Sequence, residues 1–147
     1  ARWACQKGNA AGSAATAELY PADPDAAFGV EELAAFTSEV LDRSPQSQDA
    51  DEKKALRQAY AKDGFLRKAM NYVERRLQEM PGPFLLGETA SLADYALYGL
   101  VDMICKGDFD GVEPAYVDEF PSVKAHHGAV PGSRLFKEYV AAYGKEP

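Results

Sequence analysis

The segment that most constrains the fold is residues 83–104, PFLLGETASLADYALYGLVDMI, because a helix start signal comes directly before a long apolar run. Ser91 stands at the position of an N-cap, where its side-chain oxygen can accept a hydrogen bond from the backbone N–H of Asp94. The Asp94 carboxylate can in turn accept from the backbone N–H of Ser91. This Ser-x-x-Asp is a variant of the capping box, and we predict that its role is structural.

The residues after this cap predict the central and most buried helix of the domain. Its apolar positions are Leu92, Ala93, Ala96, Leu97, Leu100, Val101 and Ile104. A helix that is apolar on nearly every side packs against neighbours on nearly every side. Its alanines and Gly99 would admit those neighbours closely.

Other segments also show apolar residues at helical spacing, and they predict an all-α fold of about five helices. The further helices are expected at Ala26–Arg43, Asp51–Met80, Pro121–Val130 and Ser133–Tyr143. Gly64 would mark a bend or a close helix contact within the longest of them. Residues 8–18, GNAAGSAATAE, have no periodic pattern and predict a loop or linker. No segment alternates with period two over a useful length.

The amino-acid composition limits which classes of partner this chain can bind. The 147 residues carry a net charge of -7, which disfavours nucleic acid or an anionic membrane surface as the main partner. No apolar run approaches the roughly 20 residues that a membrane span needs. We therefore expect no nucleic acid and no membrane span, and a soluble intracellular protein in the cytoplasm or an organelle.

The residue types alone predict neither a metal site nor an active site. Cys5 and Cys105 lie far apart in the sequence without a C-x-x-C motif, so they are interpreted as unpaired thiols. His126 and His127 are adjacent, and on a helix such neighbours point about 100° apart. We interpret them as surface or packing residues.

The order of these features resembles the C-terminal helical domain of cytosolic glutathione transferases. The matching segments are LYPADP, the two helices that follow it, residues 82–104, DEFPSVKAHHGAV and LFKEYVAAY. In that family the segment carried here by Ser91 and Asp94 is the hallmark capping box, and Phe120-Pro121 with His126 is a second match. The resemblance, at most to the sigma class, implies such a helical domain over residues 19–147. It also implies that residues 1–18 are a remnant of the last helix of a thioredoxin-like domain plus a linker.

The resemblance implies an activity as well, namely the conjugation of glutathione to hydrophobic electrophiles when the thioredoxin-like half is present. That half supplies nearly all of the glutathione site in the family, so glutathione is the implied co-substrate and this chain alone has no implied catalytic residue. In the family the electrophile lies against two helices of the helical domain. The corresponding candidates here are Phe36, Val40 and Tyr143.

A second function stays open, that of a non-catalytic docking or accessory subunit in a larger protein assembly. Several classes of the family have an Asp where Ala35 stands here, and that Asp holds glutathione bound to the partner subunit. Ala35 and the insertion at residues 8–18 therefore favour this second hypothesis. Either function is compatible with a homodimer or a larger complex, and a storage role is a third possibility.

Overall fold

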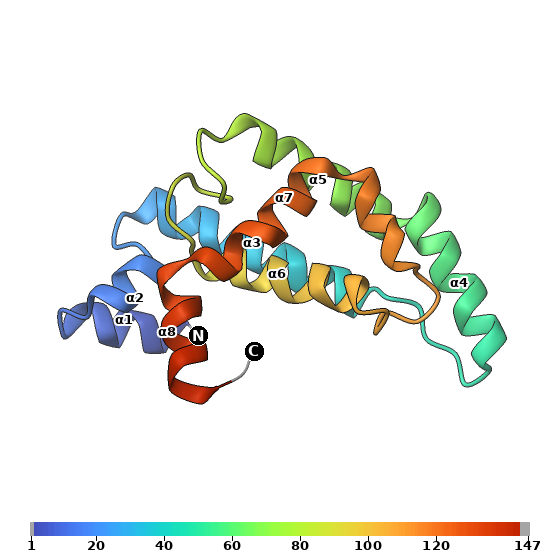
Figure 1. The fold of residues 1–147 in the computed structure, drawn as a ribbon, viewed down its shortest axis with the longest axis horizontal. Coiled ribbons are helices and arrows are strands. Elements are labelled where there is room, and N and C mark those ends of the chain that lie inside the picture. Colours follow the sequence, from blue (N-terminus) through green and yellow to red (C-terminus); the bar gives the residue numbers. More distant parts are fainter. Residues whose placement is uncertain (1, 145–147) are drawn as a thin grey trace.

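The computed structural model describes residues 2–144, so Ala1 and residues 145–147 lie outside the described part of the chain. This part is all-α, as predicted, and it contains no strand (Figure 1). Its α-helices are α1 (Arg2–Ala10), α2 (Ala14–Leu19), α3 (Pro24–Asp42), α4 (Ala50–Lys62), α5 (Phe65–Glu79), α6 (Leu92–Cys105), α7 (Pro121–Ala129) and α8 (Arg134–Tyr143). Two short 3-10 helices, η1 (Pro114–Glu119) and η2 (Val130–Gly132), flank α7.

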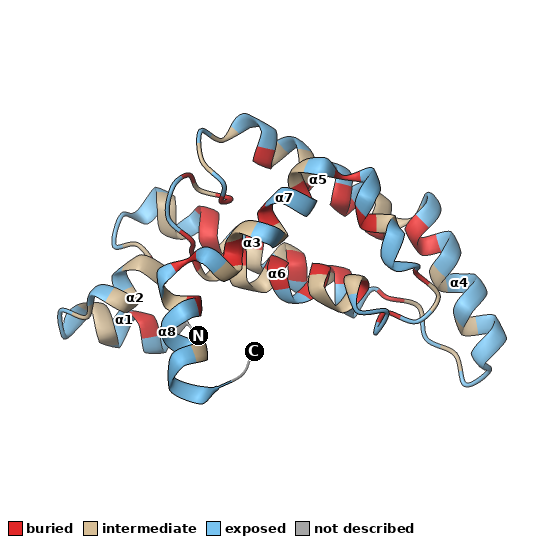
Figure 2. Cartoon of the chain, viewed as in Figure 1, coloured by how far each residue is buried: buried red, intermediate tan, exposed pale blue. Residues whose placement is uncertain are grey.

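Helix α6 lies at the centre of the core, which confirms the expectation from its sequence. It contacts α3, α7 and both 3-10 helices. Val101 and Ile104 on α6 are completely buried, as is Val30 on α3. Helix α5 packs on α3 and α7, and α4 packs on α5. Figure 2 shows that the buried residues gather along α6 and along the sides of the helices that face it.

The predicted helix over residues 51–80 is in fact two helices that meet at Gly64. Helix α4 ends at Lys62, and α5 begins at Phe65. A Cβ atom on Gly64 would lie 2.7 Å from the Tyr60 Cα atom and 2.8 Å from the Tyr60 carbonyl oxygen. Because an L side chain does not fit at this distance, the sharp bend depends on the glycine.

The prediction of a loop over residues 8–18 is wrong for most of that segment. Helix α1 continues to Ala10, and α2 begins at Ala14. A Cβ atom on Gly8 would lie within 2.4 Å of the Thr16 side chain, so the two short helices pack very closely there. Alanine favours helix even where no apolar periodicity is present, which explains the error. The division into residues 1–18 and 19–147 stays a prediction.

Helix α7 depends on a carboxylate from another helix for the cap at its start. The Glu74 carboxylate on α5 accepts hydrogen bonds from the backbone N–H of Ser122, at 2.9 and 3.0 Å, and of Val123, at 3.0 Å. Burial alone would raise the pKa of Glu74, but the hydrogen bonds from Val123, Ser122 and Gln78 outweigh it and lower the pKa. The charged carboxylate also interacts favourably with the positive end of the helix dipole.

We predict that Glu74→Ala lowers the free energy of unfolding by about 2 kcal/mol, because it leaves two helix N–H groups without their acceptor. Urea unfolding at neutral pH measures this change. Glu79→Ala is the matched control, since Glu79 is an exposed residue at the end of the same helix. Equal effects of the two substitutions would contradict the capping role of Glu74.

Candidate functional site

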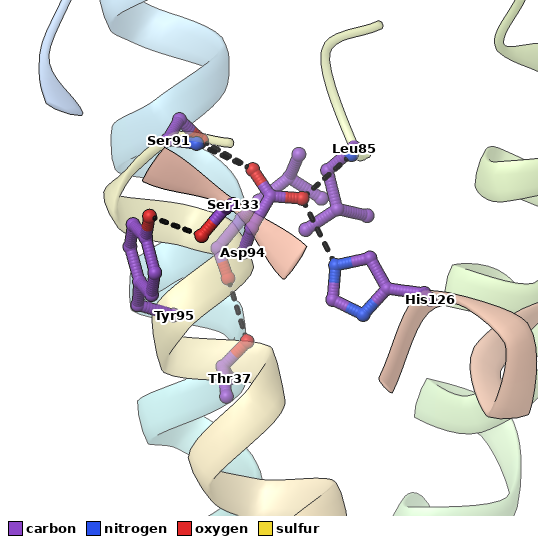
Figure 3. A network of polar contacts seen from close by, with 8 residues as sticks. Thr37, Leu85, Ser91, Asp94, Tyr95, His126 and Ser133 are labelled. Atoms are coloured by element: carbon purple, nitrogen blue, oxygen red, sulfur yellow. Dashed lines mark hydrogen bonds and ion pairs between the residues drawn. The ribbon is translucent and has the colours of Figure 1, made fainter. Parts of the chain in front are cut away.

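A closed polar network around Asp94 fixes the start of α6 (Figure 3). Ser91 and Asp94 form the predicted capping box. One carboxylate oxygen of Asp94 accepts hydrogen bonds from the backbone N–H and the hydroxyl of Ser91, both at 2.8 Å. The other accepts from the backbone N–H of Leu85 at 2.7 Å and from Nε2 of His126 at 3.0 Å.

This network is structural, because no solvent or ligand reaches it. The side chains of Asp94 and His126 are both 0% exposed. Burial alone would raise the pKa of Asp94, but the hydrogen bonds from His126, Leu85 and Ser91 outweigh it and lower the pKa. The carboxylate is therefore ionised, and Nε2 of His126 must be the donor in their contact.

The structure confirms that His126 is a packing residue and shows a partner that the sequence did not indicate. Its neighbour His127 lies on another side of α7, as predicted. The His127 ring stacks on Tyr98, with ring centroids 4.8 Å apart and planes 9° apart. Its Nε2 atom lies 3.2 Å from a carboxylate oxygen of Asp102. Neither histidine joins a metal site, and no group of metal-binding side chains forms within residues 2–144.

The candidate ligand site is an open apolar cavity of about 800 Å³ between α6 and α8, which we call the α6–α8 groove. Its lining residues are Leu19, Tyr95, Tyr98, Gly99, Asp102, Met103, Lys106, Asp108, Leu135, Phe136 and Tyr139. Cavities that bind small molecules have volumes of about 300–1,000 Å³ and mostly apolar walls. The groove has the size and the chemistry of such a site.

Gly99 leaves part of the groove floor without a side chain. Gly99 is an exposed residue in the middle of α6. A Cβ atom added to it would meet no atom within 4 Å. A glycine inside a helix costs about 1 kcal/mol relative to alanine, and no contact within the described residues requires one here. This residue keeps the groove open at the cost of some helix stability.

The walls of the groove are aromatic and are held by polar contacts at the start of α8. Tyr98 and Phe136 pack edge to face, with ring centroids 5.4 Å apart. The hydroxyl of Tyr95 lies 2.9 Å from that of Ser133, which directly precedes α8. Arg134 contacts Glu18 of α2, with its Nε atom 3.0 Å from a carboxylate oxygen. These contacts fix the position of α8 relative to α6 and α2 near the start of α8.

The polar end of the groove carries more negative than positive charge. Asp102 contacts the Lys106 ammonium at 2.6 Å as well as the His127 ring. Burial alone would raise the pKa of Asp102, but the hydrogen bonds from Lys106 and His127 outweigh it and lower the pKa. Asp108 is exposed, and within residues 2–144 its carboxylate has no hydrogen bond or ion pair.

The three predicted substrate residues do not meet in one cavity. Phe36 is half-buried and packs edge to face against Tyr72, with centroids 5.1 Å apart. Val40 is 1% exposed and lies in the core. Tyr143 is 67% exposed at the end of α8, where its ring lies 4.8 Å from that of Tyr139 in the groove. A substrate-binding role for the three stays a prediction.

The groove does not fit glutathione itself. Glutathione is a tripeptide with two carboxylates, and such a ligand needs cationic or backbone N–H donors. Among the described residues, Lys106 is the one cation that lines the groove, and it already contacts Asp102. A glutathione molecule would therefore have to be bound by residues elsewhere.

Cysteine chemistry and membrane insertion are not supported at this site either. Cys5 and Cys105 are both free thiols, and neither lines the groove. Burial raises the pKa of the Cys105 thiol, which makes it a weaker nucleophile at neutral pH. Within the described helices, none has the length and apolar character that would let it cross a bilayer.

A comparison with protein families gives one match for this chain. Residues 36–142 match the model described as "Glutathione S-transferase, C-terminal domain". The match includes α6, its capping box and every residue of the groove except Leu19. Comparisons with curated proteins and with solved structures give no match.

We predict that Asp94→Asn lowers the free energy of unfolding by about 3 kcal/mol, because an amide cannot accept all four hydrogen bonds. The lowered folded pKa of Asp94 means that its contribution is present above the ordinary Asp value of 3.8 and is lost as the pH falls through the folded value. The difference from wild type should therefore shrink in acid.

Urea unfolding at neutral pH and in acid below that ordinary value measures both effects. Asp110→Asn is the control, because Asp110 is an exposed residue whose ion pair with Lys53 lies at the surface and is screened by solvent. If Asp94→Asn were no more destabilising than this control, the network would not hold the start of α6.

Proposed function

Because this chain belongs to the family of glutathione S-transferase C-terminal domains, we propose that it is the helical half of a glutathione transferase. In this proposal the protein conjugates glutathione to apolar electrophiles when a thioredoxin-like half is present. The chain itself contributes the binding site for the electrophile, and the other half contributes the residues that bind glutathione.

The observation that carries this proposal is the α6–α8 groove. It is open and aromatic, and its volume of about 800 Å³ suits a molecule of drug size. The packed and buried rings of Tyr98 and Phe136 form a fixed apolar base, Tyr139 is 40% exposed on the α8 side, and the missing side chain at Gly99 gives an electrophile room. The role of these residues is to bind and orient, since Asp102 and Lys106 already contact each other.

A second candidate function is a non-catalytic docking or accessory subunit of a larger protein assembly. One observation favours it. The predicted substrate residues Phe36 and Val40 do not line the groove. In this case another protein would cover the groove, and no glutathione-dependent reaction would occur. An intracellular location and a homodimer are compatible with both functions.

The native polypeptide, isolated at its natural length, provides the test. We expect glutathione-dependent turnover of chlorodinitrobenzene, an apolar aromatic electrophile. We also expect Gly99→Phe to lower kcat/KM for this electrophile about tenfold, because the new ring fills the groove, while KM for glutathione is unchanged.

Gly128→Phe is the matched control, since Gly128 is exposed on α7 and a Cβ atom there also meets no neighbour. An equal loss in this control would show a general effect on folding. Absence of any glutathione-dependent turnover by the wild-type protein would refute conjugation and leave the docking function.

A further inference from the structure

We propose that the first half of α4, residues 50–57, is a latched segment that opens separately from the core. The latch is the contact of Asp110 with Lys53 and Arg57, and salt weakens it. Helix α4 lies at the opposite end of the molecule from α8 (Figure 1), so this property goes beyond the proposed function and does not rest on it.

The first step is the uneven burial along α4, most of which is exposed (Figure 2). Tyr60 and Ala61 are its buried residues, and both lie in its last turn. The Tyr60 hydroxyl donates a hydrogen bond to the backbone carbonyl of Val40 at 2.8 Å. In the latched segment no residue is buried, and Leu56 is 41% exposed. The end of α4 is therefore anchored in the core, whereas apolar burial does not hold its first half.

The second step is the set of polar contacts that does hold the latched segment. The Asp110 carboxylate lies 2.6 Å from Nζ of Lys53 and 3.5 Å from a guanidinium nitrogen of Arg57. Arg57 also donates from Nε to the backbone carbonyl of Pro45 at 3.1 Å, and its guanidinium lies over the Phe109 ring, 5.0 Å from the ring centroid. The segment is thus fastened to two loops by charged groups.

The third step is the close approach of the loop after Phe109 to the backbone of α4. Gly111 has a φ of +82°, and a Cβ atom on it would lie 2.9 Å from the carbonyl oxygen of Lys54. A residue with a side chain would be strained here in both respects. The two backbones therefore touch without apolar side chains between them, which leaves the ion pairs to hold the contact closed.

The accessibility of the latch makes it sensitive to salt. The Asp110 side chain is 56% exposed, so dissolved ions reach it and screen its attraction for Lys53 and Arg57. The apolar packing around α6 is not weakened in this way. Opening of the segment uncovers the ring of Phe109, which is 2% exposed while Arg57 lies over it. The latch thus controls whether a buried aromatic ring meets solvent.

Hydrogen–deuterium exchange of the native polypeptide, isolated at its natural length and followed by mass spectrometry, tests this proposal. The amides of residues 54–57 report on the latched segment, and those of α6 report on the core. At low salt we expect the former to exchange at least about tenfold faster. About 1 M sodium chloride should raise their exchange rate about threefold and leave that of α6 unchanged.

A pair of matched variants assigns the effect to the latch. Asp110→Asn should raise exchange in residues 54–57 about threefold at low salt and remove most of the salt effect, without changing α6. Asp118→Asn is the control, because Asp118 is also an exposed acid in a surface ion pair, and its partner Lys124 lies on α7. This control should leave exchange in α4 unchanged.

Three outcomes would overturn the proposal. Equal exchange rates in residues 54–57 and α6 of the wild-type protein would show that the segment does not open separately. Equal effects of Asp110→Asn and Asp118→Asn on α4 would show that Asp110 is not the latch. An equal rise in α4 and α6 in Asp110→Asn would mean that Asp110 stabilises the whole fold. None of these results changes the expected turnover with glutathione, so this proposal and the proposed function fail separately.

Discussion

The ionised carboxylate of Asp94 joins three parts of the chain inside the core. Burial of a charge is costly unless donors replace the lost water, and here four donors do so from Leu85, Ser91 and His126. Because α3, α7 and both 3-10 helices contact α6, the direction in which α6 starts determines how its other faces are presented. Tyr95 and Gly99 lie in the first two turns of this helix, so the position of the groove floor depends on the same carboxylate.

The sequence alone predicts those interactions that join residues close together in the chain. The capping box could be predicted because Ser91 and Asp94 are three residues apart and directly precede an apolar run, which is the signature of a helix start. The donors from Leu85 and His126 are 9 and 32 residues from Asp94, and no periodic pattern indicates such contacts. Only the family resemblance, through Phe120-Pro121 and His126, gave that histidine a special position.

The candidate site was harder to predict, because periodicity shows which faces are apolar and does not show which apolar face stays uncovered. Gly99 was visible in the sequence, and its expected role was to admit a close neighbour within the domain. In the structure the space over Gly99 is open instead. Phe36 and Val40 lie on an apolar face too, but α3 turns that face toward α5 and the core. The difference lies in the packing of the helices, which sequence spacing does not specify.

The two walls of the groove are not equally anchored, and this bears on how the groove can select a ligand. Helix α6 is held on several sides by the core, whereas α8 buries only Phe136 among its described residues. The contacts that fix α8, from Tyr95 and Glu18, lie near its start, so the Tyr139 side of the groove has fewer restraints. A wall with few restraints adapts to many apolar shapes at small cost. Discrimination must then come from α6, where the missing side chain at Gly99 leaves room for a flat ring.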